Sequence, residues 1–252
     1  MRETAFAKIN LALHVREREA DGYHRIETLF AFCDDGDVLT ARDAAKLSLD
    51  IVGPFAAALA GEDDNLVLKA ARALGRTAAL TLDKRLPVAA GIGGGSADAA
   101  AALRLFGGGS ELAARLGADV PACLLSCTAR GEGRGDRLEL VEIPRLTGTP
   151  VLLVNPNLPL STAAVFKAWD GIDRGPLGDW RKGRNDLEVP AIALFPEIRA
   201  VLCALEGATF ARMSGSGATC FGLFDNVAAR DIKAAAIARA QPDWWTMKSC
   251  LR

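Results

Sequence analysis

Residues 86–98 read LPVAAGIGGGSAD, and four of the five positions from Gly91 to Gly95 are glycine. Glycine loses the most conformational freedom on folding, so such a loop is unfavourable unless backbone must approach a ligand closely. The composition of 78–84 predicts a strand before the loop, and 96–106 a helix after it, with Ser96 as N-cap and Asp98 in the first turn. A strand, a glycine loop and a helix start in this order indicate a phosphate cradle, because N–H groups and the helix dipole converge there.

Two familiar nucleotide loops do not fit this spacing. The Walker loop ends in Gly-Lys-Ser or Gly-Lys-Thr, and this loop contains no lysine. The dinucleotide fingerprint needs a glycine where Ser96 stands, and it belongs to the first unit of a regularly alternating βαβ chain. A merely flexible turn is the remaining alternative, and the strong helix that follows disfavours it.

Composition limits the class of protein. The 252 residues have a formal net charge of −1, half are apolar, and nothing gives the positive field of a general nucleic-acid binder. We see no signal peptide and no stretch of the roughly 20 apolar residues that would cross a membrane, so we expect a cytoplasmic protein. The six cysteines form no C-x-x-C pair, and we expect buried, reduced thiols.

The remaining pattern mixes strands and helices without a regular βαβ rhythm, which predicts an α+β protein of two domains, 1–145 and 146–252. We find no internal repeat. The expected strands are 4–15, 23–32, 37–41, 46–52, 78–84, 138–143, 151–154, 210–213, 219–224 and 245–250. The expected helices are 65–74, 96–106, 111–116, 162–169, 196–205 and 227–239.

The stretch PVAAGIGGGSADAA at 87–100 resembles the ATP-binding motif of the galactokinase, homoserine kinase, mevalonate kinase and phosphomevalonate kinase (GHMP) superfamily. Further segments resemble one family in it, the 4-diphosphocytidyl-2-C-methyl-D-erythritol kinases of the non-mevalonate isoprenoid pathway. These segments are AKINLALHV at 7–15, READGYHRIETLF at 18–30, DNLV at 64–67, LGADVP at 116–121, RNDLE at 184–188 and MSGSGATCF at 213–221. Ala89 and Ala90 depart from the glycines that are common in the family, and Ala97-Asp98 from the commoner Ser-Asn.

The resemblance implies a fold and an activity. The fold is an N-terminal ATP-binding domain of mixed sheet and helices, followed by a ferredoxin-like α+β domain. The activity is transfer of the γ-phosphate of ATP, with Mg²⁺, to the 2-hydroxyl of 4-diphosphocytidyl-2-C-methyl-D-erythritol. The expected partner is this small molecule and not nucleic acid or membrane, and the expected state is a monomer or weak homodimer.

Two residues match the catalytic positions of the family. Asp119 would accept or orient the acceptor's proton, although the residues alone favour an N-cap for a helix that begins at Val120-Pro121. Lys8 would face Asp119 and favour its carboxylate form, although a solvent-facing lysine on an edge strand is the alternative. Asn10 lies two residues on, on the same strand face, and would hydrogen-bond the acceptor.

The resemblance also implies the binding residues. Tyr23 and Phe166 would stack on the cytosine, His24 would read its edge, and Thr162 would contact the same half of the acceptor. Gly215, Ser216 and Gly217 would form the wall beside the phosphates. The ATP site would comprise Asn65, Leu66, Lys84, Pro87, Val88, Ala89, Ala90, Gly91, Ile92, Gly93, Gly94, Gly95, Ser96 and Ala97. The metal ligands stay unassigned, because Ala97 lacks the hydroxyl of the commoner serine.

Two other functions stay open at this stage. A kinase of another small alcohol, such as homoserine or mevalonate, is disfavoured by Tyr23 in the ADGYH segment, since those acceptors carry no base to stack. A non-catalytic nucleotide-binding or RNA-binding module on the same fold is disfavoured by the presence of Lys8 and Asp119 and by the near-zero net charge.

Overall fold

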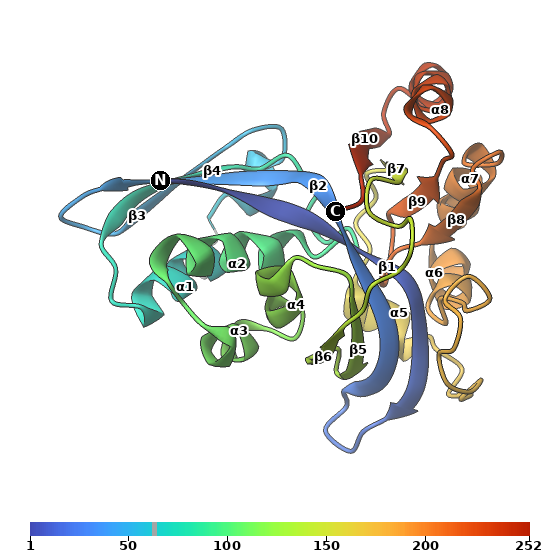
Figure 1. The fold of residues 1–252 in the computed structure, drawn as a ribbon, viewed down its shortest axis with the longest axis horizontal. Helices are drawn as coiled ribbons and strands as arrows, with labels where there is room; N and C mark the ends of the chain where they lie inside the picture. Colours follow the sequence, from blue (N-terminus) through green and yellow to red (C-terminus); the bar gives the residue numbers. More distant parts are fainter. Residues whose placement is uncertain (62–64) are drawn as a thin grey trace.

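A computed structural model describes residues 1–61 and 65–252. Asp64, the first residue of the DNLV segment, lies outside the described residues. The protein is α+β, with a six-stranded and a four-stranded sheet (Figure 1). Within the described part, no helix is both long and apolar enough to span a bilayer.

The six-stranded sheet has the order β3-β4-β2-β5-β6, and β1 pairs with β2 alongside it. Its strands are β1 (Arg2–Arg18), β2 (His24–Asp43), β3 (Ser48–Val52), β4 (Ala78–Asp83), β5 (Ala129–Gly133) and β6 (Arg137–Leu140). The accompanying helices are η1 (Ala56–Leu59), α1 (Leu66–Ala73), α2 (Gly94–Phe106), α3 (Ser110–Leu116) and α4 (Val120–Leu125).

The hairpin of β1 and β2 runs the length of the molecule (Figure 1). The expected strands 23–32 and 37–41 are parts of one continuous β2. Three register shifts, beginning between Phe6 and Lys8, bend the hairpin. Lys8 and Asn10 lie on one face as expected, but this face is also buried, so β1 is covered on both sides.

The helix after the glycine loop starts two residues earlier than expected. Gly93 is the N-cap of α2, in the left-handed region at φ 66°, so the expectation of Ser96 as N-cap is wrong. Asp98 lies beyond the first turn and binds Lys84 instead. The alanine-rich face of α2 is fully buried, because small side chains let the helix pack closely on β1 and β2.

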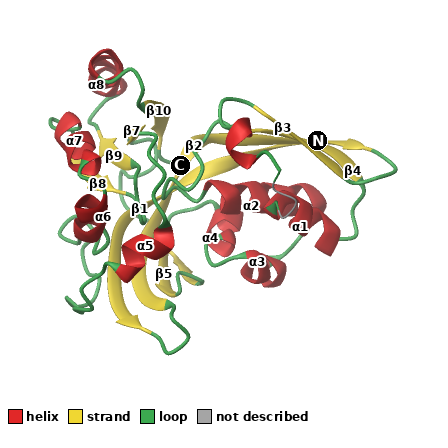
Figure 2. Ribbon diagram, turned by 180° about the vertical axis from the view of Figure 1, so that it is seen from behind, coloured by secondary structure: helices red, strands yellow, loops and turns green. Residues whose placement is uncertain are grey.

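The four-stranded sheet has the antiparallel order β10-β7-β9-β8, with helices between β7 and β8 and between β9 and β10, which is the ferredoxin-like arrangement. Figure 2 shows its helices in a group apart from α1–α4. The elements are β7 (Pro150–Asn155), α5 (Thr162–Lys167), α6 (Glu188–Leu194), α7 (Glu197–Ala204), β8 (Phe210–Met213), β9 (Cys220–Leu223), α8 (Val227–Ala240) and β10 (Trp245–Cys250).

The division at residue 145 stays a prediction. One hydrophobic cluster draws on both halves of the chain, including Ile9 and Leu11 from β1 and Val151 and Phe221 from the second sheet. All six cysteines are free, but Cys127 and Cys203 are exposed, so the expectation of burial is wrong for these two.

Candidate active site

A cavity of about 770 Å³ lies where the two sheets meet. Its walls come from β1, the glycine loop, the start of α4, helix α5 and the turn between β8 and β9. The sequence-predicted residues that line it are Lys8, Asn10, Tyr23, His24, Leu66, Ala89, Ala90, Gly91, Gly93, Gly94, Gly95, Ser96, Asp119, Thr162, Phe166, Gly215 and Ser216.

A second cavity, of about 240 Å³, is also lined by the glycine loop and shares Leu66, Ala89, Gly94 and Gly95 with the first. It adds four more predicted residues and also Asp98, which was not predicted to belong to a site. The four are Asn65, Lys84, Pro87 and Val88. Apart from Ile92 and Ala97, the predicted nucleotide residues therefore line one or both of these two cavities.

The loop leaves free backbone donors at the start of α2. Gly94, Gly95 and Ser96 are the first three helical residues, and such N–H groups have no partner within a helix. By contrast, Ile92 is fully buried, and Ala97 is buried with its N–H bound to the carbonyl of Gly93. Among the described residues, the N–H groups without a partner at this helix start are thus those of Gly94, Gly95 and Ser96.

Lys8 and Asp119 meet at the cavity. Lys8 Nζ lies 3.2 Å from Asp119 Oδ2, and the lysine side chain is only 4% exposed against 36% for the aspartate. The lysine stem packs against the loop, where a Cβ on Gly93 would lie 3.1 Å from Lys8 Cε. Asp119 is the N-cap residue of α4, but its side chain makes no capping hydrogen bond. The carboxylate therefore remains available to a ligand.

Asn10 is held in place by the Lys8 ammonium group. Its Oδ1 accepts from Lys8 Nζ at 2.9 Å, and its Nδ2 donates to Thr28 Oγ1 at 2.7 Å. The Asn10 side chain thus orients the ammonium group of Lys8. The expected hydrogen bond from Asn10 to the acceptor would have to use the same Oδ1 or Nδ2 atom that already binds Lys8 or Thr28.

The far end of the large cavity is aromatic. The rings of His24 and Phe166 lie 4.9 Å apart, while Tyr23 is 56% exposed. The Arg134 guanidinium lies 4.0 Å from the Tyr23 ring centroid, a contact that the sequence did not indicate. Burial, and secondarily Arg18, lowers the pKa of His24, so its imidazole is neutral at pH 7 and can both donate and accept.

The second glycine turn packs on the first, backbone against backbone. A Cβ on Gly91 would lie 2.5 Å from the Ser214 carbonyl oxygen, and one on Gly215 would lie 2.8 Å from that of Gly91. Only glycine fits at either position, because a side chain would collide with main chain. Thr162 Oγ1 lies 2.8 Å from Ser216 Oγ and so ties α5 to this turn. Gly217 does not line the cavity.

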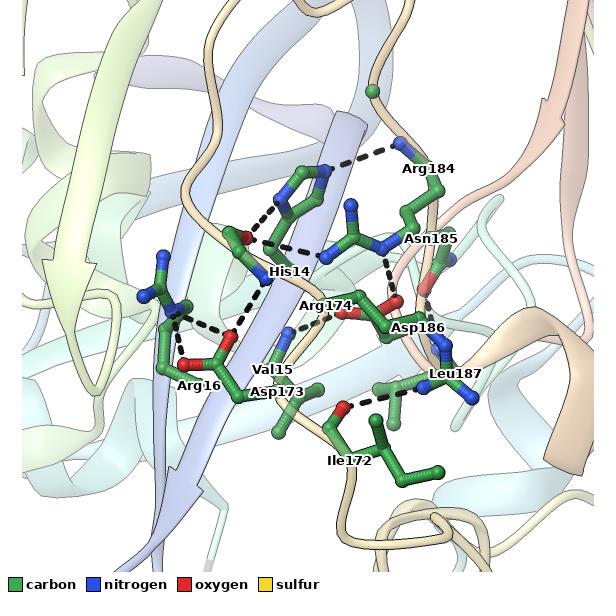
Figure 3. Close-up of polar contacts among 12 residues, drawn as sticks. His14, Val15, Arg16, Ile172, Asp173, Arg174, Arg184, Asn185, Asp186 and Leu187 are labelled. Carbon is green, nitrogen blue, oxygen red and sulfur yellow. Dashed lines mark hydrogen bonds and ion pairs between the residues drawn. The ribbon is translucent and has the colours of Figure 1, made fainter.

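The RNDLE segment at 184–188 holds the second glycine turn in position. Asn185 donates to the carbonyl oxygens of Met213 and Gly215, both at 2.8 Å, and so fixes the second glycine turn. Figure 3 shows the neighbouring contacts: Arg184 binds Asp186, which accepts from the Val15 N–H, and His14 lies between Arg184 and the preceding loop. These contacts join β1 to the second half of the chain.

Two predicted nucleotide residues already have partners. Asn65 Oδ1 caps α1 by accepting from the Val67 N–H at 2.9 Å. Lys84 Nζ contacts Asp37 at 2.5 Å and Asp98 at 2.7 Å, so its charge is already balanced by carboxylates. A role for Lys84 in offsetting phosphate charge stays a prediction.

Comparison with known proteins identifies the class first. The model for the N-terminal domain of GHMP kinases matches residues 65–126, and that for GHMP kinases C terminal matches residues 170–242. Together with the loop and the fold, these matches define a GHMP-type kinase. A mevalonate kinase from Methanococcus jannaschii shares the fold, with a TM-score of 0.69 at 10% identity, 100% of this chain and 98% of that chain being covered.

More similar proteins identify the family within the GHMP-type kinases. A protein from Rhizorhabdus wittichii named 4-diphosphocytidyl-2-C-methyl-D-erythritol kinase is 56% identical to this chain, over 99% of this chain and 94% of that protein. A protein of the same name from Novosphingobium aromaticivorans is 54% identical, over 100% of this chain and 93% of that protein. A crystal structure of 4-(cytidine 5'-diphospho)-2C-methyl-D-erythritol kinase has a TM-score of 0.82 at 33% identity over 99% of both chains. The chain belongs to the family of 4-diphosphocytidyl-2-C-methyl-D-erythritol kinases.

Proposed function

We propose that this protein transfers the γ-phosphate of ATP to the 2-hydroxyl of 4-diphosphocytidyl-2-C-methyl-D-erythritol, in the non-mevalonate route to isoprenoid precursors. The observation that carries the proposal is the Lys8–Asp119 pair, 3.2 Å apart in the same cavity as the free amides of Gly94–Ser96. Membership of the family supports the choice of acceptor.

The residues suggest how the transfer proceeds. The Asp119 carboxylate takes the proton from the acceptor hydroxyl as its oxygen attacks the γ-phosphorus, and the bond from that phosphorus to the β–γ bridging oxygen breaks to release ADP. The Lys8 ammonium, held by Asn10, lies beside the carboxylate and attracts the reacting oxygens. The N–H groups of Gly94–Ser96 bind the phosphates.

At the other end of the cavity, Tyr23 and Phe166 hold the cytosine and His24 binds its edge. A neutral imidazole suits this task, because cytosine offers both a donor and acceptors. Arg18 and Lys167 also line the cavity and supply positive charge that suits a diphosphate. Arg134 lines it too, but its charge is balanced by Glu19 and Asp21.

Mg²⁺ belongs to the proposal as the ion that neutralises charge on the transferred phosphate. Across residues 1–61 and 65–252, no three His, Cys, Asp or Glu side chains are grouped so as to hold a metal. The nucleotide phosphates would therefore supply most of the ligands, as is common for Mg²⁺.

The test is an assay of ADP release with a panel of acceptors. We expect turnover with 4-diphosphocytidyl-2-C-methyl-D-erythritol, and none above background with homoserine, mevalonate or the same alcohol without its cytidine group. Equal rates with an acceptor that lacks a base would favour another small-alcohol kinase. ATP binding without turnover of any acceptor would favour a non-catalytic module.

A further inference from the structure

Beneath the glycine loop lies a buried cluster of three charged residues, Asp37, Lys84 and Asp98. Lys84 Nζ contacts Oδ2 of both aspartates, and the three residues are 0%, 2% and 3% exposed. Two carboxylates share one ammonium group, so the cluster is negative by one charge when both are ionised. In a buried site such an excess acts more strongly than at the surface, because little water screens it.

The two aspartates are not equivalent. Asp37 Oδ1 accepts from the N–H groups of Arg85 and Leu86 at 2.5 and 2.8 Å, so both of its oxygens have partners. Asp98 Oδ1 is buried and has no hydrogen-bond partner among the residues that the structure describes. Burial raises the pKa of Asp98 to about 7, with Lys84 opposing the shift and Asp37 adding to it. Asp98 is therefore the carboxyl whose ionisation decides whether the cluster carries the surplus charge.

The cluster also lies next to the expected position of the phosphates. A Cβ on Gly94 would be 3.1 Å from Lys84 Nζ and 3.9 Å from Asp37 Oδ2. Asp98 lines the smaller cavity together with Gly94 and Gly95, whose N–H groups point from the start of α2. Other charged or titratable groups beside this loop are Lys8 of β1, and Asp119 and Cys123 at α4.

We propose that Asp98 sets the charge beneath the phosphate loop and thereby weakens the enzyme's hold on nucleotide phosphates. This inference rests on the proposed function, since it needs a phosphate bound at Gly94–Ser96. The surplus carboxylate repels that phosphate through the helix start, so ADP leaves more readily than it would leave a neutral cluster. The Lys84–Asp37 pair alone would keep the ammonium in place.

The experiment compares ADP with adenosine, which lacks phosphate, by isothermal titration calorimetry at pH 8. We expect Asp98→Asn to bind ADP about three- to tenfold more tightly than the wild type, because one buried negative charge is gone, and to bind adenosine equally well. Glu111→Gln, which removes an exposed carboxylate from α3, is the matched control and should bind both ligands as the wild type does. At pH 6, where Asp98 of the wild type is largely protonated, the difference in ADP affinity between Asp98→Asn and the wild type should shrink.

Unchanged or weaker ADP binding by Asp98→Asn at pH 8 would overturn the inference. So would a parallel gain for adenosine, since a structural change would affect both ligands. Asp98→Ser removes the same charge with a smaller side chain and should give the same gain, and thermal melts check that each variant is folded. A wild type that binds neither ADP nor adenosine would contradict the proposed function itself. If the wild type binds ADP but Asp98→Asn binds it no more tightly, only the role of Asp98 is contradicted.

Discussion

At the scale of single residues, the two members of the catalytic pair differ in their surroundings. Lys8 is enclosed by Asn10, the Phe30 ring and the glycine loop, while Asp119 keeps part of its side chain exposed to the cavity. An ammonium that is fixed on three sides can orient an incoming oxygen, and a carboxylate that is open on one side can accept a proton. The difference in burial thus suits the two roles proposed for them.

Asp119→Asn should lower turnover by about 10²- to 10⁴-fold, because the amide has no basic oxygen for the acceptor's proton. ADP affinity should stay within about twofold of the wild type, since the free amides of the loop are untouched. Asp225→Asn, at an exposed position after β9, is the control and should keep normal turnover. Single-turnover kinetics measures the effect, and wild-type turnover in Asp119→Asn would remove Asp119 from the mechanism.

Tyr23→Ala should raise the KM for the cytidine-bearing acceptor by roughly 10- to 100-fold, as expected from the loss of a base-stacking partner. The KM for ATP should change little, because Tyr23 lies in the turn between β1 and β2 and not in the glycine loop. Tyr23→Phe keeps the ring and should behave nearly as the wild type. Steady-state kinetics with each substrate varied in turn checks this, and an equal rise in both KM values would refute stacking.

At the scale of elements, the glycine loop contains one residue under strain. Ala89 has φ 53°, in the left-handed region that costs a residue with a Cβ roughly 1 kcal/mol or more. It stands where the family commonly has glycine. The alanine at position 89 therefore adopts a backbone conformation that favours glycine.

Ala89→Gly should raise the free energy of unfolding by up to about 1 kcal/mol, since relief of the strained φ outweighs the extra entropy of glycine in the unfolded chain. Ala90→Gly is the matched control, because Ala90 is buried without a positive φ, and it should lower stability by about 1 kcal/mol. Urea denaturation measures both. A loss of stability in both variants would show that Ala89 is not strained.

The elements that the sequence predicted well are those with strong local patterns. The glycine loop, the helix after it and the strands of the second half follow from spacing and composition, and the expected α+β fold is confirmed. Strand β5 (Ala129–Gly133) was missed, because ARGEG is polar and ends in glycine; pairing with β2 stabilises it. Helix α6 was missed because Pro190 lies in its first turn, where proline is tolerated but weakens the pattern.

At the scale of the whole molecule, the site depends on contacts between distant segments. The sequence could indicate Lys8, Asp119 and Tyr23 through resemblance, but the Asp37–Lys84–Asp98 cluster and the Arg134–Tyr23 contact join residues 14 to 111 positions apart. Local periodicity carries no information on such pairs. The two glycine turns, 124 positions apart at Gly91 and Gly215, likewise pack together only in three dimensions.

His14 makes the contact between β1 and the second half of the chain depend on pH. Its Nε2 accepts from the Arg184 N–H at 3.2 Å, so the neutral ring donates from Nδ1 to the Gly175 carbonyl at 3.0 Å (Figure 3). Burial lowers the pKa of His14 below 6.5, and Arg184 adds to this while Gly175, Asp186 and Glu27 oppose it. The unfolded chain therefore binds the proton more readily than the folded one.

Stability should consequently fall as the pH drops from about 6.5 toward the lowered pKa of folded His14, and His14 should contribute no pH dependence near pH 8. His14→Gln should be less stable than the wild type at pH 8, where the ring contacts are lost, and should show a shallower fall below pH 6.5. Urea denaturation at a series of pH values measures both. An identical pH slope in the two proteins would rule out His14 as the titrating group.

The last two residues of the chain pair with β2, near the beginning of the chain. Leu251 bridges to Cys33 of β2, and the Arg252 N–H donates to the Phe32 carbonyl at 3.0 Å. Leu251 is fully buried among residues of β1 and β2. On a ribosome, then, the amino-terminal hairpin emerges more than two hundred residues before the side chain that completes its packing, and until then it offers apolar surface to chaperones.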